Sequence, residues 1–94
     1  MIVESTISGT TFCAVYGHLG ATMYPGEGKN VGRGQYIGTV GSTAESGQST
    51  PHLHLGVHYG PYGYPTGTYP GWCRGYAPSY TGGWEWPTLF IQAW

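Results

Sequence analysis

Charged side chains are scarce in this sequence, and basic ones most of all. Only 7% of its 94 residues are Asp, Glu, Lys or Arg, against about 25% in an average soluble domain. The three basic residues are Lys29, Arg33 and Arg74. Binding to a phosphate backbone needs clustered positive charge. We therefore expect no nucleic-acid partner.

Long apolar runs are missing as well. Glycine and proline, with 18 and 7 residues, interrupt every hydrophobic stretch, and none of these stretches approaches the roughly 20 residues that cross a bilayer. No membrane span is therefore expected. The first six residues, MIVEST, lack the basic segment and apolar stretch of a secretory signal peptide, so export has to be inferred from other features.

Helical periodicity is absent too, because no segment repeats apolar residues at a sustained spacing of 3.6. Together with the scattered Gly and Pro, this predicts a mainly β fold in one domain of residues 1–94. Residues 1–59 should alternate strands and tight turns, and residues 60–94 should form a long aromatic, Gly- and Pro-rich loop with a terminal strand. The expected strands are Ile2–Ile7, Thr11–His18, Tyr36–Val40, His52–Tyr59 and Leu89–Ala93.

The two cysteines, Cys13 and Cys73, leave two interpretations open. They form a disulfide in an oxidising compartment, or they are two buried thiols. A bridge between them would close a loop of about 60 residues and stabilise the fold by about 4 kcal/mol.

The segment PHLHLGVH at residues 51–58 is the most informative one. On a strand, Leu53, Leu55 and Val57 would share one face, the core side. The other face would carry His52, His54 and His58 together with Gly56. Cα atoms two residues apart are about 6.6 Å apart, so both imidazoles can converge on one metal ion and its bound water. His58 would lie about 13 Å from His54 and is left out of the site. The plainer interpretation is that the histidines are solvated polar residues.

Several spaced motifs, in order, accompany this segment. PHLHLGVH resembles the His-Leu-His motif of the lysostaphin-like zinc endopeptidases, peptidase family M23. The run Tyr16-Gly17-His18-Leu19 is similar to that family's Tyr-x-His-Leu strand. The remaining matches to its hairpin and loop are Val31, Gly34, Ile37-Gly38, Gly41-Ser42-Thr43 and Ser49-Thr50-Pro51. The resemblance covers roughly residues 10–59 and is far more specific than one motif.

The resemblance implies both a fold and a set of residue roles. The fold would be the antiparallel sheet of a lysostaphin-like domain of the barrel-sandwich hybrid type, incomplete at its N-terminus. Residues 44–48 would lengthen or alter the family's loop before Ser49. His54 would be a zinc ligand, while His52 and His18 would be the general base and transition-state stabilisers. The implied activity is hydrolysis of peptide bonds in bacterial cell-wall peptidoglycan, in the cell envelope or outside the cell.

Part of the family's zinc site has no counterpart in this chain. The other two family ligands come from an upstream His-x-x-x-Asp motif, but no histidine precedes His18 and the sequence has no aspartate. Glu4 and Glu27 are conceivable substitutes, although a lone carboxylate in a Gly-rich chain is usually a surface charge. We therefore expect a fragment that is inactive alone and lacks the N-terminal half of its domain, which would lie in a longer reading frame or on another polypeptide.

Two other functions stay open. A degenerate peptidase fold would act as a non-catalytic cell-wall-binding or regulatory module. The aromatic C-terminal part, with all four tryptophans and six of the nine tyrosines after residue 58, would alternatively bind carbohydrate by stacking on sugar rings. Those aromatics are equally explained as a second core of a small domain.

Overall fold

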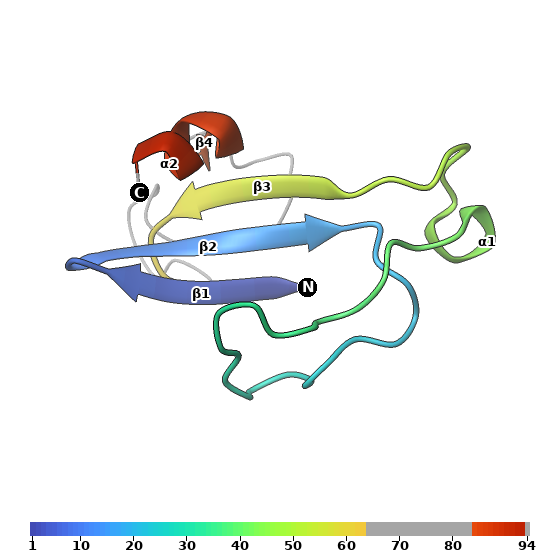
Figure 1. Cartoon of the computed structure of the whole chain (residues 1–94), viewed down its shortest axis with the longest axis horizontal. Helices are drawn as coiled ribbons and strands as arrows, with labels where there is room; N and C mark the ends of the chain where they lie inside the picture. Colours follow the sequence, from blue (N-terminus) through green and yellow to red (C-terminus); the bar gives the residue numbers. More distant parts are fainter. Residues whose placement is uncertain (64–83, 94) are drawn as a thin grey trace. The chain divides into compact units, whose positions relative to one another are not determined.

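The computed structural model describes residues 1–63 and 84–93. Four strands form one antiparallel sheet in the order β1-β2-β3-β4, and two short helices complete the described elements (Figure 1). The elements are β1 (Ile2–Ile7), β2 (Thr10–Gly17), α1 (Thr43–Ser46), β3 (His54–Tyr59), β4 (Trp84–Glu85) and α2 (Pro87–Ala93). The predicted mainly β class is confirmed. No helix in these described ranges is long and apolar enough to cross a membrane.

The chain divides into two compact units. The first comprises Met1 and Gly17–His54, and the second comprises Ile2–Tyr16 together with Leu55–Trp94. The sheet belongs to the second unit, apart from the last residue of β2 and the first of β3. The assignment of residues 1–94 to a single domain stays a prediction.

β1 and β2 form a hairpin whose register runs from the Ile2–Val15 pair to the Ile7–Thr10 pair. Its two-residue turn is Ser8-Gly9, and both residues have positive φ, 50° and 80°. Two successive positive φ angles are the property of the turns whose twist matches that of a hairpin. Both strands predicted for this part of the chain are confirmed, the second with each end shifted by one residue.

The core of the second unit covers both faces of β2. On one face, Phe12, Val57 and Phe90 form a buried cluster in which the rings of Phe12 and Phe90 lie 4.6 Å apart. On the other face, Cys13 and Val15 are buried. Neighbouring strand residues point to opposite faces, so burial of both Phe12 and Cys13 means that both faces of the sheet are covered at β2.

The terminal strand predicted at Leu89–Ala93 is wrong, because these residues form the end of helix α2. Pro87 occupies the first helical position, where a missing N–H is harmless. The Phe90 amide donates to the Trp86 carbonyl at 2.9 Å, which is the spacing of an α-helical bond. A short apolar run cannot be assigned to strand or helix by periodicity alone.

The strand predicted at Tyr36–Val40 is also wrong. Val40 makes only an isolated bridge with Leu19, and two further backbone bonds join Gly20 to Thr39 and Tyr24 to Ile37. These contacts hold two irregular segments together without a continuous ladder.

The predicted strand at His52–Tyr59 begins two residues late, at His54. Its expected division into a core face and a histidine face is correct for Val57, which is buried, but wrong for two other residues. Leu53 is 44% exposed, whereas His58 is 1% exposed. Leu53 precedes the strand, so the alternation of a sheet does not apply to it. His58 is buried, and its ring packs edge-on against that of Trp84.

Candidate functional site

Three histidines from two distant parts of the sequence come together in the first unit. His18 directly follows β2, His54 is the first residue of β3, and these strands are neighbours in the sheet. The ring centroid of His18 lies 4.8 Å from that of His52 and 5.7 Å from that of His54. The three residues predicted from the sequence are therefore adjacent, with His18 contacting both others.

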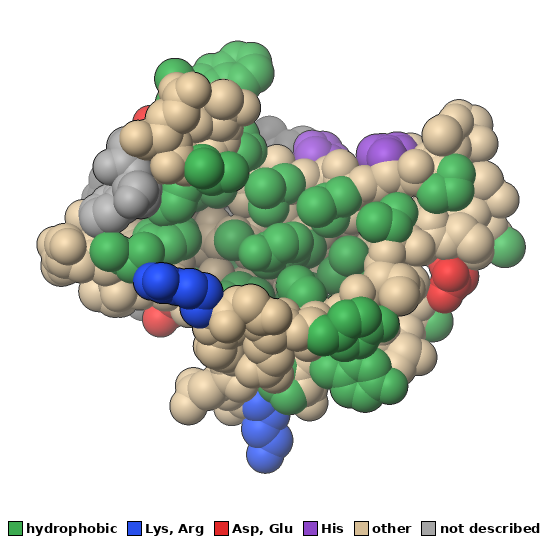
Figure 2. All heavy atoms as spheres, in the orientation of Figure 1, with side chains coloured by type: hydrophobic (Ala, Val, Ile, Leu, Met, Phe, Trp, Pro, Cys, Tyr) green, Lys and Arg blue, Asp and Glu red, His purple; other side chains and the backbone are tan. Residues whose placement is uncertain are grey.

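The histidine cluster is open to solvent. His52 and His54 are exposed, and His18 is half-buried; histidine side chains reach the surface in the view of Figure 2. The nitrogens of an exposed imidazole can be reached by a metal ion, a water molecule or a substrate. The arrangement is accessible enough for chemistry on a large substrate.

His18 has an unusual backbone conformation with φ of 63°. A non-glycine residue in this left-handed region costs about 1–2 kcal/mol, so its surroundings must hold it there. The His18 carbonyl accepts a hydrogen bond from the Gly41 amide at 2.8 Å. A Cβ atom on Gly41 would lie only 2.8 Å from the His18 oxygen and 2.9 Å from that of Leu19. Gly41 thus permits the close approach that holds the turn at His18.

The His52 ring is oriented by a backbone carbonyl. Its Nδ1 lies 2.7 Å from the carbonyl oxygen of Thr50. A carbonyl can only accept, so Nδ1 must carry the proton in this contact. In the neutral ring, Nε2 is then unprotonated and has its lone pair available. This arrangement suits a group that accepts a proton from water.

A short helix beside the site replaces part of the loop expected at residues 44–48. In α1, the Ser42 side chain accepts from the Glu45 amide, and the Glu45 side chain accepts from the Ser42 amide at 3.1 Å, which makes a capping box. The helix ends at Gly47, which has φ of 72°. The sequence does carry the signal, because Ser-x-x-Glu is the pattern of a capping box. No apolar run follows it, so the pattern by itself is weak.

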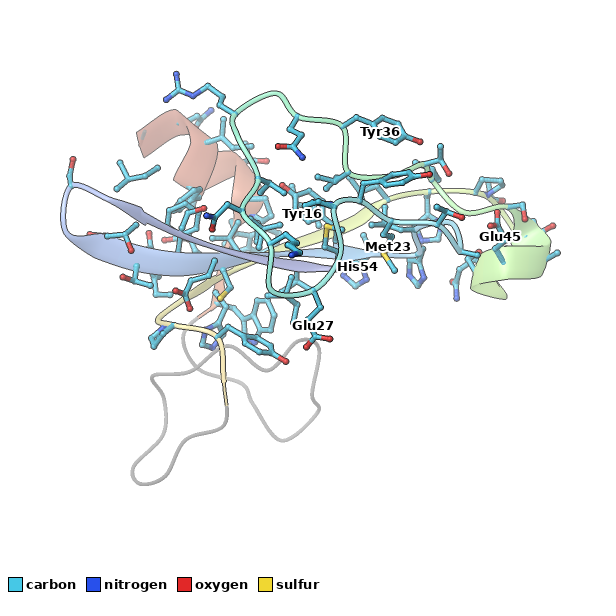
Figure 3. The ribbon with its side chains drawn as sticks, turned by 90° about the horizontal axis from the view of Figure 1, so that it is seen from below. Tyr16, Met23, Glu27, Tyr36, Glu45 and His54 are labelled. Carbon is cyan, nitrogen blue, oxygen red and sulfur yellow. The ribbon has the colours of Figure 1, made fainter. Side chains whose placement is uncertain are left out.

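Glu45 also reaches outside its helix. Its Oε2 accepts a hydrogen bond from the Ala21 amide at 2.8 Å, and Figure 3 shows its position on α1. This bond, followed by those from Ser42, lowers the pKa of the Glu45 carboxyl group. The segment after His18 is therefore tied to α1 by a charged side chain.

The remaining candidate residues lie elsewhere. His58 belongs to the second unit and packs edge-on against Trp84, with centroids 4.9 Å apart. Glu4 lies in that unit too, and its carboxylate accepts from the Tyr62 amide at 2.8 Å. Glu27 is exposed on a part of the loop separate from Glu45 (Figure 3). Among the described residues, neither carboxylate belongs to a group of three or more His, Cys, Asp or Glu side chains that could hold a metal ion.

The C-terminal expectations are largely untested. Residues 64–83 of the long loop predicted from residue 60 onward, including Cys73 and Trp72, fall outside the described residues. The disulfide between Cys13 and Cys73 therefore stays a prediction. At the described end of this loop the prediction is wrong, because Trp84–Glu85 form strand β4 and helix α2 begins at Pro87.

The donor set of the described residues fits part of a zinc site. Imidazole nitrogen is a regular zinc ligand, and a catalytic zinc takes three protein ligands and leaves one position open. Within residues 1–63 and 84–93, no group of three or more His, Cys, Asp or Glu side chains is arranged to hold a metal ion. The exposed His54 would suit one of these ligand positions.

Comparison with known protein families gives a match over most of the chain. The model of peptidase family M23 matches residues 2–66. This range contains all three histidines of the cluster and both strands that flank it. Searches of curated proteins and of solved structures found no match to this chain.

Proposed function

The chain belongs to peptidase family M23, and from that premise we propose that it contributes the catalytic histidines of a zinc-dependent endopeptidase acting on bacterial cell-wall peptidoglycan. The observation that carries this proposal is the contact of His18 with both His52 and His54. Three solvent-accessible imidazoles supply one metal ligand and two groups for proton transfer and charge stabilisation. Peptidoglycan lies outside the cytoplasm, so the proposal places the protein in the cell envelope or outside the cell.

Each histidine has its own role in the proposal. His54 supplies one nitrogen ligand to zinc. His52 is the general base, because its Nδ1–H···O=C bond to Thr50 leaves Nε2 free to accept a proton. His18 is held next to both rings and donates a hydrogen bond to the oxyanion that develops on the scissile carbonyl.

The reaction follows from these roles. When bound, zinc lowers the pKa of a water molecule to about 7 and polarises the scissile carbonyl. As the water oxygen attacks the carbonyl carbon, Nε2 of His52 takes the proton. The same nitrogen returns that proton to the leaving amine as the C–N bond breaks. His18 stabilises the negative oxygen in between, and the products are a carboxylate and an amine.

The described residues offer one zinc ligand, so the remaining ligands must come from another segment. The family resemblance implies that this segment carries a His-x-x-x-Asp motif. We call the chain together with that segment the completed enzyme. Either a longer reading frame or a second polypeptide would provide it, and reading the coding sequence before Met1 distinguishes the two.

The direct test is hydrolysis of purified peptidoglycan by the completed enzyme. We expect about one zinc ion per chain by elemental mass spectrometry, and release of new amino groups that stops with a chelator and returns with zinc. Cell-wall binding without zinc or new amino groups would contradict the proposal and support a non-catalytic binding module. Retained affinity for isolated glycan strands alone would support the carbohydrate-binding alternative.

A further inference from the structure

The segment that holds His18 is paired with a second segment through backbone bonds. The Gly41 amide donates to the His18 carbonyl, Leu19 bridges Val40, and the Gly20 amide donates to the Thr39 carbonyl. These contacts run along residues 18–20 on one side and residues 39–41 on the other. All of them belong to the first unit. The orientation of His18 therefore depends on how firmly the two segments are joined.

Glu45 links the two paired segments a second time, through the residues that follow each of them. Because the segments pair in the antiparallel sense, these two residues lie beyond opposite ends of the pairing. Its Oε2 accepts from Ala21, the residue after Gly20, and its Oε1 accepts from Ser42, the residue after Gly41. One carboxylate thus binds one amide from each of the paired segments. A neutral amide side chain has a single acceptor oxygen and could keep only one of these two bonds.

The fit of the carboxylate is tight. A Cβ atom on Gly20 would lie 3.2 Å from Oε2 of Glu45 and 2.8 Å from Oγ1 of Thr39. Gly20 is buried. The absence of a side chain at residue 20 lets the carboxylate sit directly against the backbone next to His18.

We propose that Glu45 is a positioning residue that sets the orientation of the His18 imidazole by joining Ala21 to Ser42. The catalytic consequence rests on the proposed function of His18. The geometric part does not, since it concerns only how the ring is held. Glu45 acts through backbone hydrogen bonds and does not itself touch substrate.

The geometric part is tested by NMR on the 94-residue chain. In the native chain we expect a nuclear Overhauser effect between the His18 and His52 rings, whose centroids are 4.8 Å apart, and slow exchange of the Ala21 amide. Glu45→Gln should remove both signals while circular dichroism stays unchanged. Gly20→Ala should have the same effect, because its methyl group displaces the carboxylate.

Two control variants separate positioning from other effects. Glu27→Gln removes an equal charge from an exposed loop site and should leave both signals intact. Ser42→Ala removes the hydroxyl, which accepts from the Glu45 amide at 3.2 Å and also hydrogen-bonds the carboxylate, but it leaves in place the two bonds from the Ala21 and Ser42 amides. It should weaken the cap of α1 and leave the His18 ring where it is.

The catalytic part is tested by the kinetics of the completed enzyme. Glu45→Gln should lower kcat by roughly 10- to 100-fold with KM and zinc content unchanged, as expected for a misplaced catalytic group. Unchanged ring contacts in Glu45→Gln, or an equal loss in Ser42→Ala, would overturn the proposal. If the native enzyme hydrolyses nothing, the proposed function fails, and the NMR comparison still decides whether Glu45 positions the ring.

Discussion

The rings of His18 and His52 lie with their centroids 4.8 Å apart and their planes tilted by 58°. One residue follows strand β2 and the other precedes strand β3, so the contact depends on the pairing of these neighbouring strands. The centroid of the His54 ring lies 5.7 Å from that of His18. Because the three imidazoles have different proposed roles in metal binding and catalysis, replacing each one should have a different effect.

Replacing the three histidines one at a time should separate metal binding from catalysis. In the completed enzyme, His54→Ala should abolish zinc retention. His18→Ala and His52→Ala should keep the metal and lower turnover by roughly 10²- to 10⁴-fold, the usual effect of removing an acid–base group. Zinc content after gel filtration and the rate of amino-group release check this. Equal loss of metal in all three variants would show that the ligand and catalytic roles are misassigned.

The protonated nitrogen of the neutral His52 ring should be Nδ1. The contact with the Thr50 carbonyl at 2.7 Å requires a proton on that nitrogen. Long-range proton–nitrogen correlation spectra of the 94-residue chain distinguish the two tautomers. The exposed His54 ring serves as an internal comparison. A proton found on Nε2 of His52 would rule out that nitrogen as the base in the resting protein.

Acid should loosen the link between α1 and the segment after His18. Hydrogen bonds from Ala21 and then Ser42 lower the pKa of Glu45 from its ordinary value of 4.5. A lowered folded-state pKa means that the stabilisation is complete above pH 4.5 and is lost as the pH falls through the folded value. Amide exchange of Ala21 followed against pH checks this. In Glu45→Gln this titration should disappear, whereas in Glu27→Gln it should persist.

Adding a methyl group at residue 41 should destabilise the first unit. The new Cβ of Gly41→Ala would lie 2.8 Å from the His18 carbonyl oxygen, and backbone atoms cannot move aside easily. We expect a loss of about 1–3 kcal/mol in the free energy of unfolding, measured in urea. Gly32→Ala is the matched control, because the nearest atom to its Cβ is a Gln35 side-chain oxygen at 3.9 Å. Equal stability of Gly41→Ala and Gly32→Ala would contradict the close packing of Gly41 against the His18 carbonyl group.

Helix α2 should be anchored by a single side chain. Phe90 is 8% exposed and packs against Phe12, whereas the adjacent Ile91 is 65% exposed. Phe90→Ala should therefore cost about 3–5 kcal/mol, and Ile91→Ala should stay within about 0.5 kcal/mol. Thermal and urea unfolding of both variants measures the difference. A similar effect at the two positions would mean that residues 87–93 do not dock as a helix.

Local patterns are sufficient to predict a part of this molecule. The strands Ile2–Ile7 and Thr11–His18 were predicted to within one residue at each end, and the resemblance of the histidine motifs to the family singled out His18, His52 and His54. Secondary structure cannot be predicted from a local sequence pattern where that pattern is compatible with both a strand and a helix. The apolar run at residues 89–93 fits a strand or a helix, and only packing of Phe90 on Phe12 decides between them.

The sequence by itself determined the mainly β class and the first two strands, because each depends on residues close together in the chain, and it identified the three histidines through motifs that resemble those of the family. The tertiary structure alone decided that His18 contacts His52 and His54, that His58 is buried against Trp84, and that Glu45 joins Ala21 to Ser42. These relationships depend on strand pairing and on contacts between distant segments. Spacing along the chain does not fix the distances between side chains of distant segments.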